Sequence, residues 1–156
     1  MSVLEQLAEA FPGAEFDTVL NGQEVAHVSV DDYAGFVTAA YAAGFDVFVD
    51  LCGVDYLRRD PRFEVVLNVL SHQHAQRLRI RVGVPASAPT VPSVTGTFPG
   101  ANFYEREAYD LFGIVFSGHP DLTRIVLPDD WEGHPLRKDY SVGSVPVRFK
   151  ESPKAP

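Results

Sequence analysis

Cysteine is almost absent from this sequence, because Cys52 is the only one among 156 residues. A single thiol cannot close a disulfide within the chain, and a cysteine-ligated iron–sulfur cluster needs several thiolates. Both are therefore excluded as features of this chain alone. So little cysteine is typical of a reducing compartment, and we expect a cytoplasmic location.

Basic residues and long apolar runs are also scarce. Thirteen Lys and Arg stand against 21 Asp and Glu, which gives a formal net charge of −8 and a pI near 5.0. This balance argues against a general nucleic-acid binder and against binding to anionic lipid by charge. No apolar run approaches the roughly 18 residues of a membrane span, and the N-terminus shows no signal-peptide pattern.

The residues that are present are sufficient for one folded domain. A chain of 156 residues with 46% apolar content buries roughly 70% of its unfolded surface. Ser2 and Glu5 form a capping-box pattern that predicts a helix, and Asp31 or Asp32 is expected to cap a second helix that Gly44 ends. The apolar residues at helical spacing are Leu4, Leu7, Ala8 and Phe11 in the first helix, and Tyr33, Phe36, Val37, Ala40 and Tyr41 in the second.

Five stretches have the character of strands. Residues 16–20 and 23–30 are separated by Asn21-Gly22, a pair suited to a tight hairpin turn. Three further strands alternate apolar and polar residues. Their apolar faces are expected to hold Val47, Val49 and Leu51, then Phe63, Val65, Leu67 and Val69, then Leu78, Ile80, Val82 and Val84.

The order helix, two strands, helix, three strands predicts a two-layer α+β fold, with helices on one face of a mixed, mainly antiparallel sheet. A third, short helix is expected over residues 101–112, with an apolar stripe of Tyr104, Ala108, Leu111 and Phe112. Periodicity disappears from Ser117 onward, and prolines interrupt the rest of the chain. Irregular stretches of this length are typical of functional or extended segments. We therefore expect an α+β domain over 1–116 and an extended C-terminal interaction arm over 117–156 that lies along another chain.

The third helix holds the first candidate for chemistry. Glu105, Glu107 and Asp110 could supply an acid/base pair. However, Arg106 and Asp110 are spaced i, i+4, so they can pair with each other on the helix surface. This spacing favours a structural or interface role over catalysis.

Two histidines with nearby carboxylates form the second candidate. His119, Asp121 and His134 could ligate zinc or iron, with Asp129 and Asp130 between them in the sequence. Both histidines lie in Gly-His-Pro steps, where ring nitrogens commonly bond backbone groups in turns. Turn architecture is therefore favoured, and a small metalloenzyme remains the alternative from a different class.

The third candidate is a row of arginines on one strand. Arg77, Arg79 and Arg81 could bind an anion, but cross-strand pairing with Glu64, Asp46 and Asp50 explains them as well. The sequence has no dinucleotide-binding glycine loop, Walker loop or nucleophile elbow. The residues alone therefore indicate no catalytic site.

Two blocks near the C-terminus carry a resemblance to a known family. They run ERE-x-YDLFGI-x-F from Glu105 and GHP-x-L-x-RI-x-LPDDWEGHPLRKDY from Gly118. Together they closely resemble the signature of the C subunit of proton-translocating NADH–quinone oxidoreductase, respiratory complex I. The order of the preceding elements also suits that family.

The resemblance implies a non-catalytic structural subunit of the peripheral arm, on the cytoplasmic side of a bacterial inner membrane. It implies no cofactor in this chain, since FMN, iron–sulfur clusters and quinone would be bound by partner subunits. The D subunit of the complex would be the chief partner, together with the B and I subunits. The equivalent subunit of an energy-converting membrane-bound hydrogenase is the alternative within the resemblance. The expected signature and interface residues are Glu105, Arg106, Glu107, Asp110, His119, Asp129, Asp130, Trp131, His134, Arg137, Lys138 and Asp139.

Overall fold

A computed structural model describes residues 2–19, 22–141 and 143 of the chain. Five strands form one sheet in the order β1-β2-β5-β4-β3, in which only β2 and β5 run parallel. The elements in chain order are α1 (Val3–Ala10), β1 (Glu15–Thr18), β2 (Glu24–Val28), α2 (Val30–Ala42), β3 (Val47–Asp55), β4 (Phe63–Ser71), β5 (Gln76–Val84), β6 (Thr90–Pro92), α3 (Ala101–Phe112) and β7 (Val115–Ser117). The predicted α+β class and mainly antiparallel sheet are confirmed.

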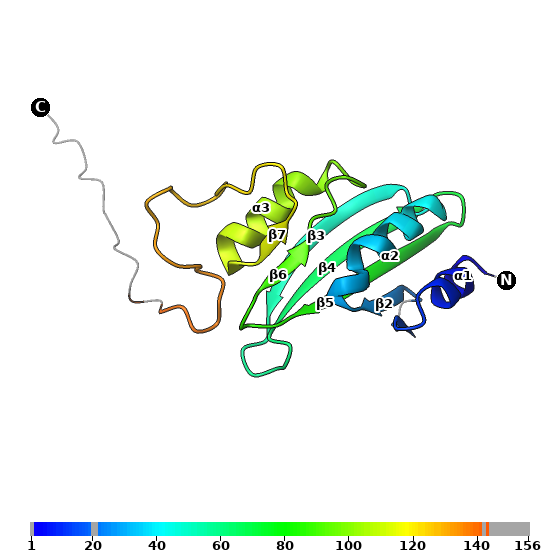
Figure 1. The fold of residues 1–156 in the computed structure, drawn as a ribbon, viewed down its shortest axis with the longest axis horizontal. Coiled ribbons are helices and arrows are strands. Elements are labelled where there is room, and N and C mark those ends of the chain that lie inside the picture. Colours follow the sequence, from blue (N-terminus) through cyan, green and yellow to red (C-terminus); the bar gives the residue numbers. More distant parts are fainter. Residues whose placement is uncertain (1, 20–21, 142, 144–156) are drawn as a thin grey trace, which may run out of the picture.

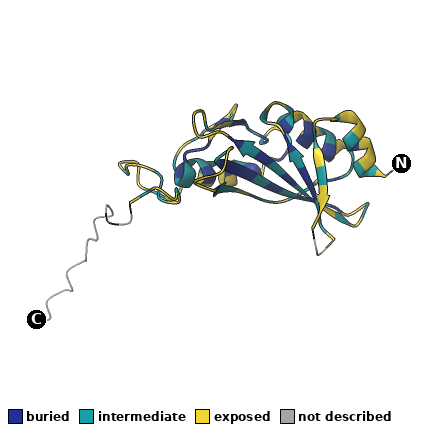
Figure 2. Cartoon of the chain, turned by 90° about the horizontal axis from the view of Figure 1, so that it is seen from below, coloured by how far each residue is buried: buried dark blue, intermediate teal, exposed yellow. Residues whose placement is uncertain are grey.

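The helices lie on one face of the sheet (Figures 1 and 2). Leu7 of α1, Phe36 of α2 and Ala108 of α3 join the same buried core as the inward side chains of the sheet. The predicted inward faces of β4 and β5 are confirmed, from Phe63 to Val69 and from Leu78 to Val84. Their clean alternation arises because only one face of this sheet is covered.

The helix ends follow the expected chemistry with one correction. The capping box of α1 is present, since Ser2 Oγ accepts a hydrogen bond from the amide of Glu5 and the Glu5 carboxylate accepts from the amide of Ser2. For α2, the expected cap at Asp31 or Asp32 is wrong. Ser29 is the cap instead, because its Oγ accepts from the amide of Asp32 at 3.1 Å. The two aspartates lie in the first turn, where their negative charges interact favourably with the positive end of the helix dipole.

The predicted apolar face of β3 is wrong in the first part of the strand, where Val49 is expected to point inward. A bulge between Phe48 and Asp50 shifts the register, so Val49 is exposed. Phe48 instead turns toward the helices, with its ring 5.2 Å from that of Tyr104. A bulge inserts one residue and so exchanges the two faces of a strand, which simple alternation does not reveal.

One turn prediction and two further differences remain. The β1–β2 hairpin forms, but Asn21 lies outside the described residues. Tyr41, expected on the inner face of α2, is 45% exposed. The stretch after β5 holds a strand that the sequence patterns do not predict, β6, which pairs in parallel with β7 to form a second small sheet.

Candidate functional site

The signature residues lie on α3 and on the stretch that follows β7, residues 118–141, called here the wrapping segment (orange in Figure 1). This segment has no helix or strand within 118–141, and none of its residues is fully buried. It nevertheless makes many hydrogen bonds to its own domain. The side chains that accept or donate those bonds define the candidate site.

Asp110 is the main anchor for the wrapping segment. Its carboxylate is fully buried and accepts from Arg124 at 2.7 Å. It also accepts from the consecutive amides of Ile125, Val126 and Leu127, at 3.1, 2.8 and 2.9 Å. Burial acts to raise the pKa of Asp110, but these four donors outweigh it, so the pKa lies below its usual value.

Glu105 holds the other side of α3. Its side chain is fully buried, and it accepts from Ser93 Oγ and from the amide of Val94, each at 2.7 Å. Burial raises the pKa of Glu105, and these two donors and the neighbouring His119 only partly offset it. The predicted apolar stripe of α3 is therefore partly wrong, because Glu105 and Asp110 are buried while Tyr104 is 36% exposed.

Arg106 does not pair with Asp110, so that expected ion pair is wrong. Its guanidinium donates instead to the carbonyl and hydroxyl oxygens of Thr123 and to the carbonyl of Arg124, at 3.0–3.1 Å. The two residues contact adjoining parts of the wrapping segment, since Arg106 bonds Thr123 and the Arg124 carbonyl while Asp110 bonds the Arg124 side chain and the three amides that follow it. Both tie that segment to α3.

The two histidines lie at opposite ends of α3. His119 Nε2 donates to the carbonyl of Asn102 at 3.2 Å, and its Nδ1 accepts from the amide of Asp121 at 3.0 Å. His134 Nδ1 donates to the carbonyl of Asp110 at 2.8 Å. Eight residues of helix rise about 12 Å, so the structure does not bring these rings together as ligands of one metal. Within the described residues, no group of three or more potential ligands is placed to hold a metal ion.

The second signature block closes the C-terminal end of α3. Three consecutive carbonyls there lack partners within the helix. The Asp110 carbonyl accepts from His134, the Leu111 carbonyl from the amide of Leu136 at 3.1 Å, and the Phe112 carbonyl from Arg137 Nε at 2.6 Å. Gly113 follows with a φ of +72°, which lets the chain turn away.

An ion cluster that local sequence patterns do not reveal fixes the far end of the wrapping segment. Arg62 donates to both carboxylate oxygens of Asp55, at 2.9 and 2.8 Å, and to both of Asp139, at 2.9 and 2.7 Å. The Lys138 amide also donates to Asp55, at 2.7 Å. The Arg62 guanidinium is the main cause that holds the pKa of Asp55 far below its usual range. The sequence contains one indication that the Asp55 carboxylate is buried, because alternation places Asp55 on the same inward face of β3 as Leu51 and Gly53.

Four signature residues take no part in these contacts. Glu107, Asp129 and Asp130 are exposed. Trp131 is half-buried, and its amide donates to the carbonyl of Pro128 at 3.0 Å. Its indole Nε1 is buried without a hydrogen-bond partner among the described residues.

The expected charge pairing on the open face of the sheet is confirmed in part. Arg81 forms an ion pair with Glu64 at 2.7 Å, and Arg79 donates to Asn68, which in turn donates to Asp50. Asp46 makes no such pair with any residue that the structure describes. Arg79 and Arg81 are therefore occupied by cross-strand partners rather than directed at a shared anion site, whereas Arg77 is exposed and makes no such pair with a described residue.

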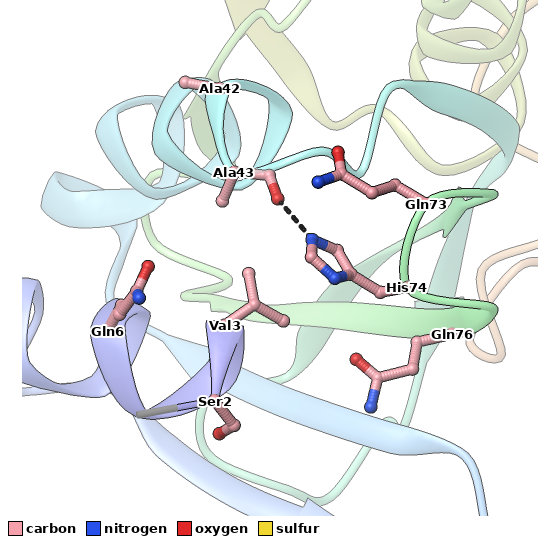
Figure 3. Close-up of a pocket in the computed structure, with 8 residues that line it drawn as sticks. All are labelled: Ser2, Val3, Gln6, Ala42, Ala43, Gln73, His74 and Gln76. Carbon is pink, nitrogen blue, oxygen red and sulfur yellow. Dashed lines mark hydrogen bonds between the residues drawn. The ribbon is translucent and has the colours of Figure 1, made fainter.

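A separate hollow of about 500 Å³ lies far from α3, where the start of α1 meets the end of α2 (Figure 3). Its polar lining includes Gln6, Gln73 and Gln76. His74 Nε2 donates to the carbonyl of Ala43 at 3.0 Å and so completes the end of α2. No described carboxylate or arginine lines it, so it lacks the converging charged groups of a catalytic site.

Hydrogen bonds and ion pairs thus hold the wrapping segment in a fixed position against α3 and the end of β3. The comparisons with known proteins identify the family. Residues 24–145 match the model of the family described as "Respiratory-chain NADH dehydrogenase, 30 Kd subunit". The chain belongs to this family. All the signature residues named above lie within the matched stretch.

Two relatives of this 30 kDa family are similar to the chain over most of their length. The C subunit of the NADH-quinone oxidoreductase of Roseiflexus sp. (strain RS-1) is 46% identical, over 95% of this chain and 87% of the relative. That of Herpetosiphon aurantiacus is also 46% identical, over 87% and 84%. The resemblance carried by the two sequence blocks is thereby confirmed.

Solved structures share the fold of this family member. The trypsin-resistant fragment (1-134) of Nqo5 is 36% identical with a TM-score of 0.70, over 78% of this chain and all of the fragment. A chain of the membrane-bound sulfane sulfur reductase, an archaeal respiratory membrane complex, has a TM-score of 0.80 at 22% identity, over 96% of this chain and 94% of that chain. The second likeness concerns the fold alone. Among the described residues, no helix is long and apolar enough to cross a bilayer.

Proposed function

We propose that this chain is a non-catalytic subunit of proton-translocating NADH–quinone oxidoreductase that supports electron transfer by docking on the subunits of the quinone site. In this role it binds no cofactor itself, and FMN, iron–sulfur clusters and quinone belong to its partners. The D subunit of the complex is the proposed chief partner, with the B and I subunits beside it. The complex would hold the chain on the cytoplasmic side of the membrane.

The observation that carries this proposal is that the charged side chains of this region make contacts within the chain, whereas its large apolar side chains are exposed. Asp110, Arg106 and Arg137 are used within the chain to hold the wrapping segment against α3. Large apolar side chains around them face outward, with Phe103 61%, Val126 58% and Leu136 48% exposed. Exposed apolar groups on a rigid support are typical of a protein–protein interface.

The equivalent subunit of another membrane-bound respiratory complex is the second candidate. The fold shared with a chain of the sulfane sulfur reductase favours it, since one fold can serve both kinds of complex. The 46% identity to subunits of NADH-quinone oxidoreductase favours the first candidate.

Affinity purification from membranes of the source organism tests the proposal. A tagged chain should co-purify with an assembly that oxidises NADH with quinone, and deletion of its gene should abolish that activity in membranes. Recovery with a hydrogenase or sulfur-reducing assembly would support the second candidate. Recovery of the chain alone, without membrane partners, would contradict both.

Replacing the exposed apolar groups tests the docking surface itself. The double variant Phe103→Ser/Val126→Ser should keep the melting temperature of the isolated protein but lose at least ten-fold of its recovery in the complex. Exposed Val19→Ser, near the N-terminal end of the chain, is the matched control and should be recovered normally.

A further inference from the structure

A hollow of about 180 Å³ opens beside β3, at the side where α3 lies. Three consecutive residues of β3 line it, namely Leu51, Cys52 and Gly53. Successive side chains of a strand point to opposite faces, so a hollow that contacts all three opens at the edge of the strand. β3 is the last strand of the sheet, and no described strand pairs with its outer side.

The size and lining of this hollow fit one apolar side chain. Leu51, Leu111 and Leu136 form its apolar wall, and Leu136 is 48% exposed. For scale, an apolar cavity of about 150 Å³ holds a benzene molecule. An unpaired strand edge beside a side-chain pocket is the arrangement that accepts an extended segment as an added strand.

The rim of the hollow is negative. Glu107 lines it, is exposed, and has no ion pair or hydrogen bond with any described residue. Burial raises the pKa of the Cys52 thiol, and the charges of Asp50 and Glu107 raise it further against the opposing effect of Arg79. A basic side chain would therefore be attracted to this rim.

We propose that an extended segment of a neighbouring subunit lies along the edge of β3, inserts one apolar side chain into this hollow and places a basic residue against Glu107. This proposal rests on the proposed function, because it takes the neighbour from the same complex. A second copy of the chain fits poorly: residues 1–57 contain ten Asp and Glu and no Lys or Arg. Pairing two β3 edges would bring like charges together, which is destabilising.

Cys52 is a natural probe of the hollow, because it is the only cysteine of the chain and is exposed in the free protein. Alkylation with a maleimide should label it at least ten-fold more slowly in the purified complex than in the isolated protein. Labelling rates within two-fold of each other would overturn this proposal. The presence of the chain in the complex would still support the proposed function. A complex that lacks the chain altogether would overturn both.

A charge reversal tests the basic residue of the partner. Glu107→Lys should reduce recovery of the chain in the complex at least ten-fold while the melting temperature of the isolated protein stays unchanged. Glu9→Lys, an exposed acid on α1, is the matched control and should be recovered normally. If both variants are recovered like the original chain, the proposed pairing at Glu107 is wrong.

Discussion

Asp55 and Lys138 are joined by a hydrogen bond of 2.7 Å from the Lys138 amide to the Asp55 carboxylate, although 83 positions separate them in the sequence. Arg62 strengthens the join, because it pairs with Asp55 on one side and Asp139 on the other. The end of β3 thus holds the last part of the wrapping segment. The stretch that the sequence predicts as an interaction arm is attached to its own domain over its described residues, and its contact with another chain remains part of the proposed function.

Removing Arg62 should destabilise the isolated protein strongly. Arg62→Met leaves the buried Asp55 carboxylate without its ion-pair partner, and breaking a buried pair costs about 3 kcal/mol. Urea unfolding measures this loss. Arg59→Met is the control: Arg59 is half-exposed and lies 3.7 Å from Glu64, so its loss should cost less than about 1 kcal/mol. Equal effects of the two variants would show that the Arg62 cluster contributes no special stability.

Asp110 should make the protein sensitive to acid. Its pKa is lower in the folded chain than in the unfolded chain, so the unfolded state binds protons first as the pH falls. The stabilisation is complete above the usual carboxyl pKa near 4 and is lost as the pH falls through the folded value. Asp110→Asn should therefore be less stable than the original chain at pH 7, and the gap should narrow toward pH 3.

Unfolding curves collected between pH 3 and 7 measure this gap. Asp129→Asn, at an exposed aspartate, is the matched control and should give no pH-dependent difference. A gap for Asp110→Asn that stays constant across the range would mean that protonation of Asp110 is not coupled to folding.

Glu105 should act in the opposite direction. Its pKa is raised in the folded chain, so the folded state holds the proton more tightly and gains stability at low pH. That contribution is complete below the usual carboxyl pKa and is lost as the pH rises through the folded value. Glu105→Gln keeps an acceptor for the Val94 amide but cannot ionise, so its stability relative to the original chain should increase with pH.

Glu105→Ala separates this pH effect from packing. It leaves the Val94 amide and the Ser93 hydroxyl without their acceptor and creates a cavity, so it should lose at least about 2 kcal/mol at every pH. Thermal or urea unfolding of both variants over pH 4 to 8 provides the comparison. A Gln variant that becomes less stable as the pH rises would contradict the expected sign.

Hydrogen exchange should reveal the attachment of the wrapping segment in the isolated protein. The Leu127 amide donates to buried Asp110 and the Lys138 amide to buried Asp55, so both should exchange at least ten-fold more slowly than the amide of the exposed residue Glu132. In Asp110→Asn the protection should fall at Leu127 and persist at Lys138. Uniformly fast exchange from 119 to 140 would show that this segment is held only in the assembled complex.

Local patterns in the sequence predicted most of the helices and strands of the fold. Alternation predicted the inward faces of β4 and β5, and a polar residue three positions before an acid predicted the cap of α1. Where a single residue changes the phase, as at Val49 in the bulge of β3, the same pattern predicts the wrong face. The sequence patterns also did not predict the parallel pair of β6 and β7, because strands of three residues are too short to show a period.

The sequence by itself determined the fold class, most of the core and, through two unbroken blocks near its C-terminus, the family. Those features depend on neighbours along the chain, whose spacing sets which side chains share a face. Only the tertiary structure decided what the signature residues do. Arg106 was free to pair with Asp110 by spacing alone, yet Asp110 binds Arg124 and three backbone amides instead. A buried carboxylate takes whichever donors the folded backbone brings to it, and those donors come from distant parts of the sequence that no local pattern connects.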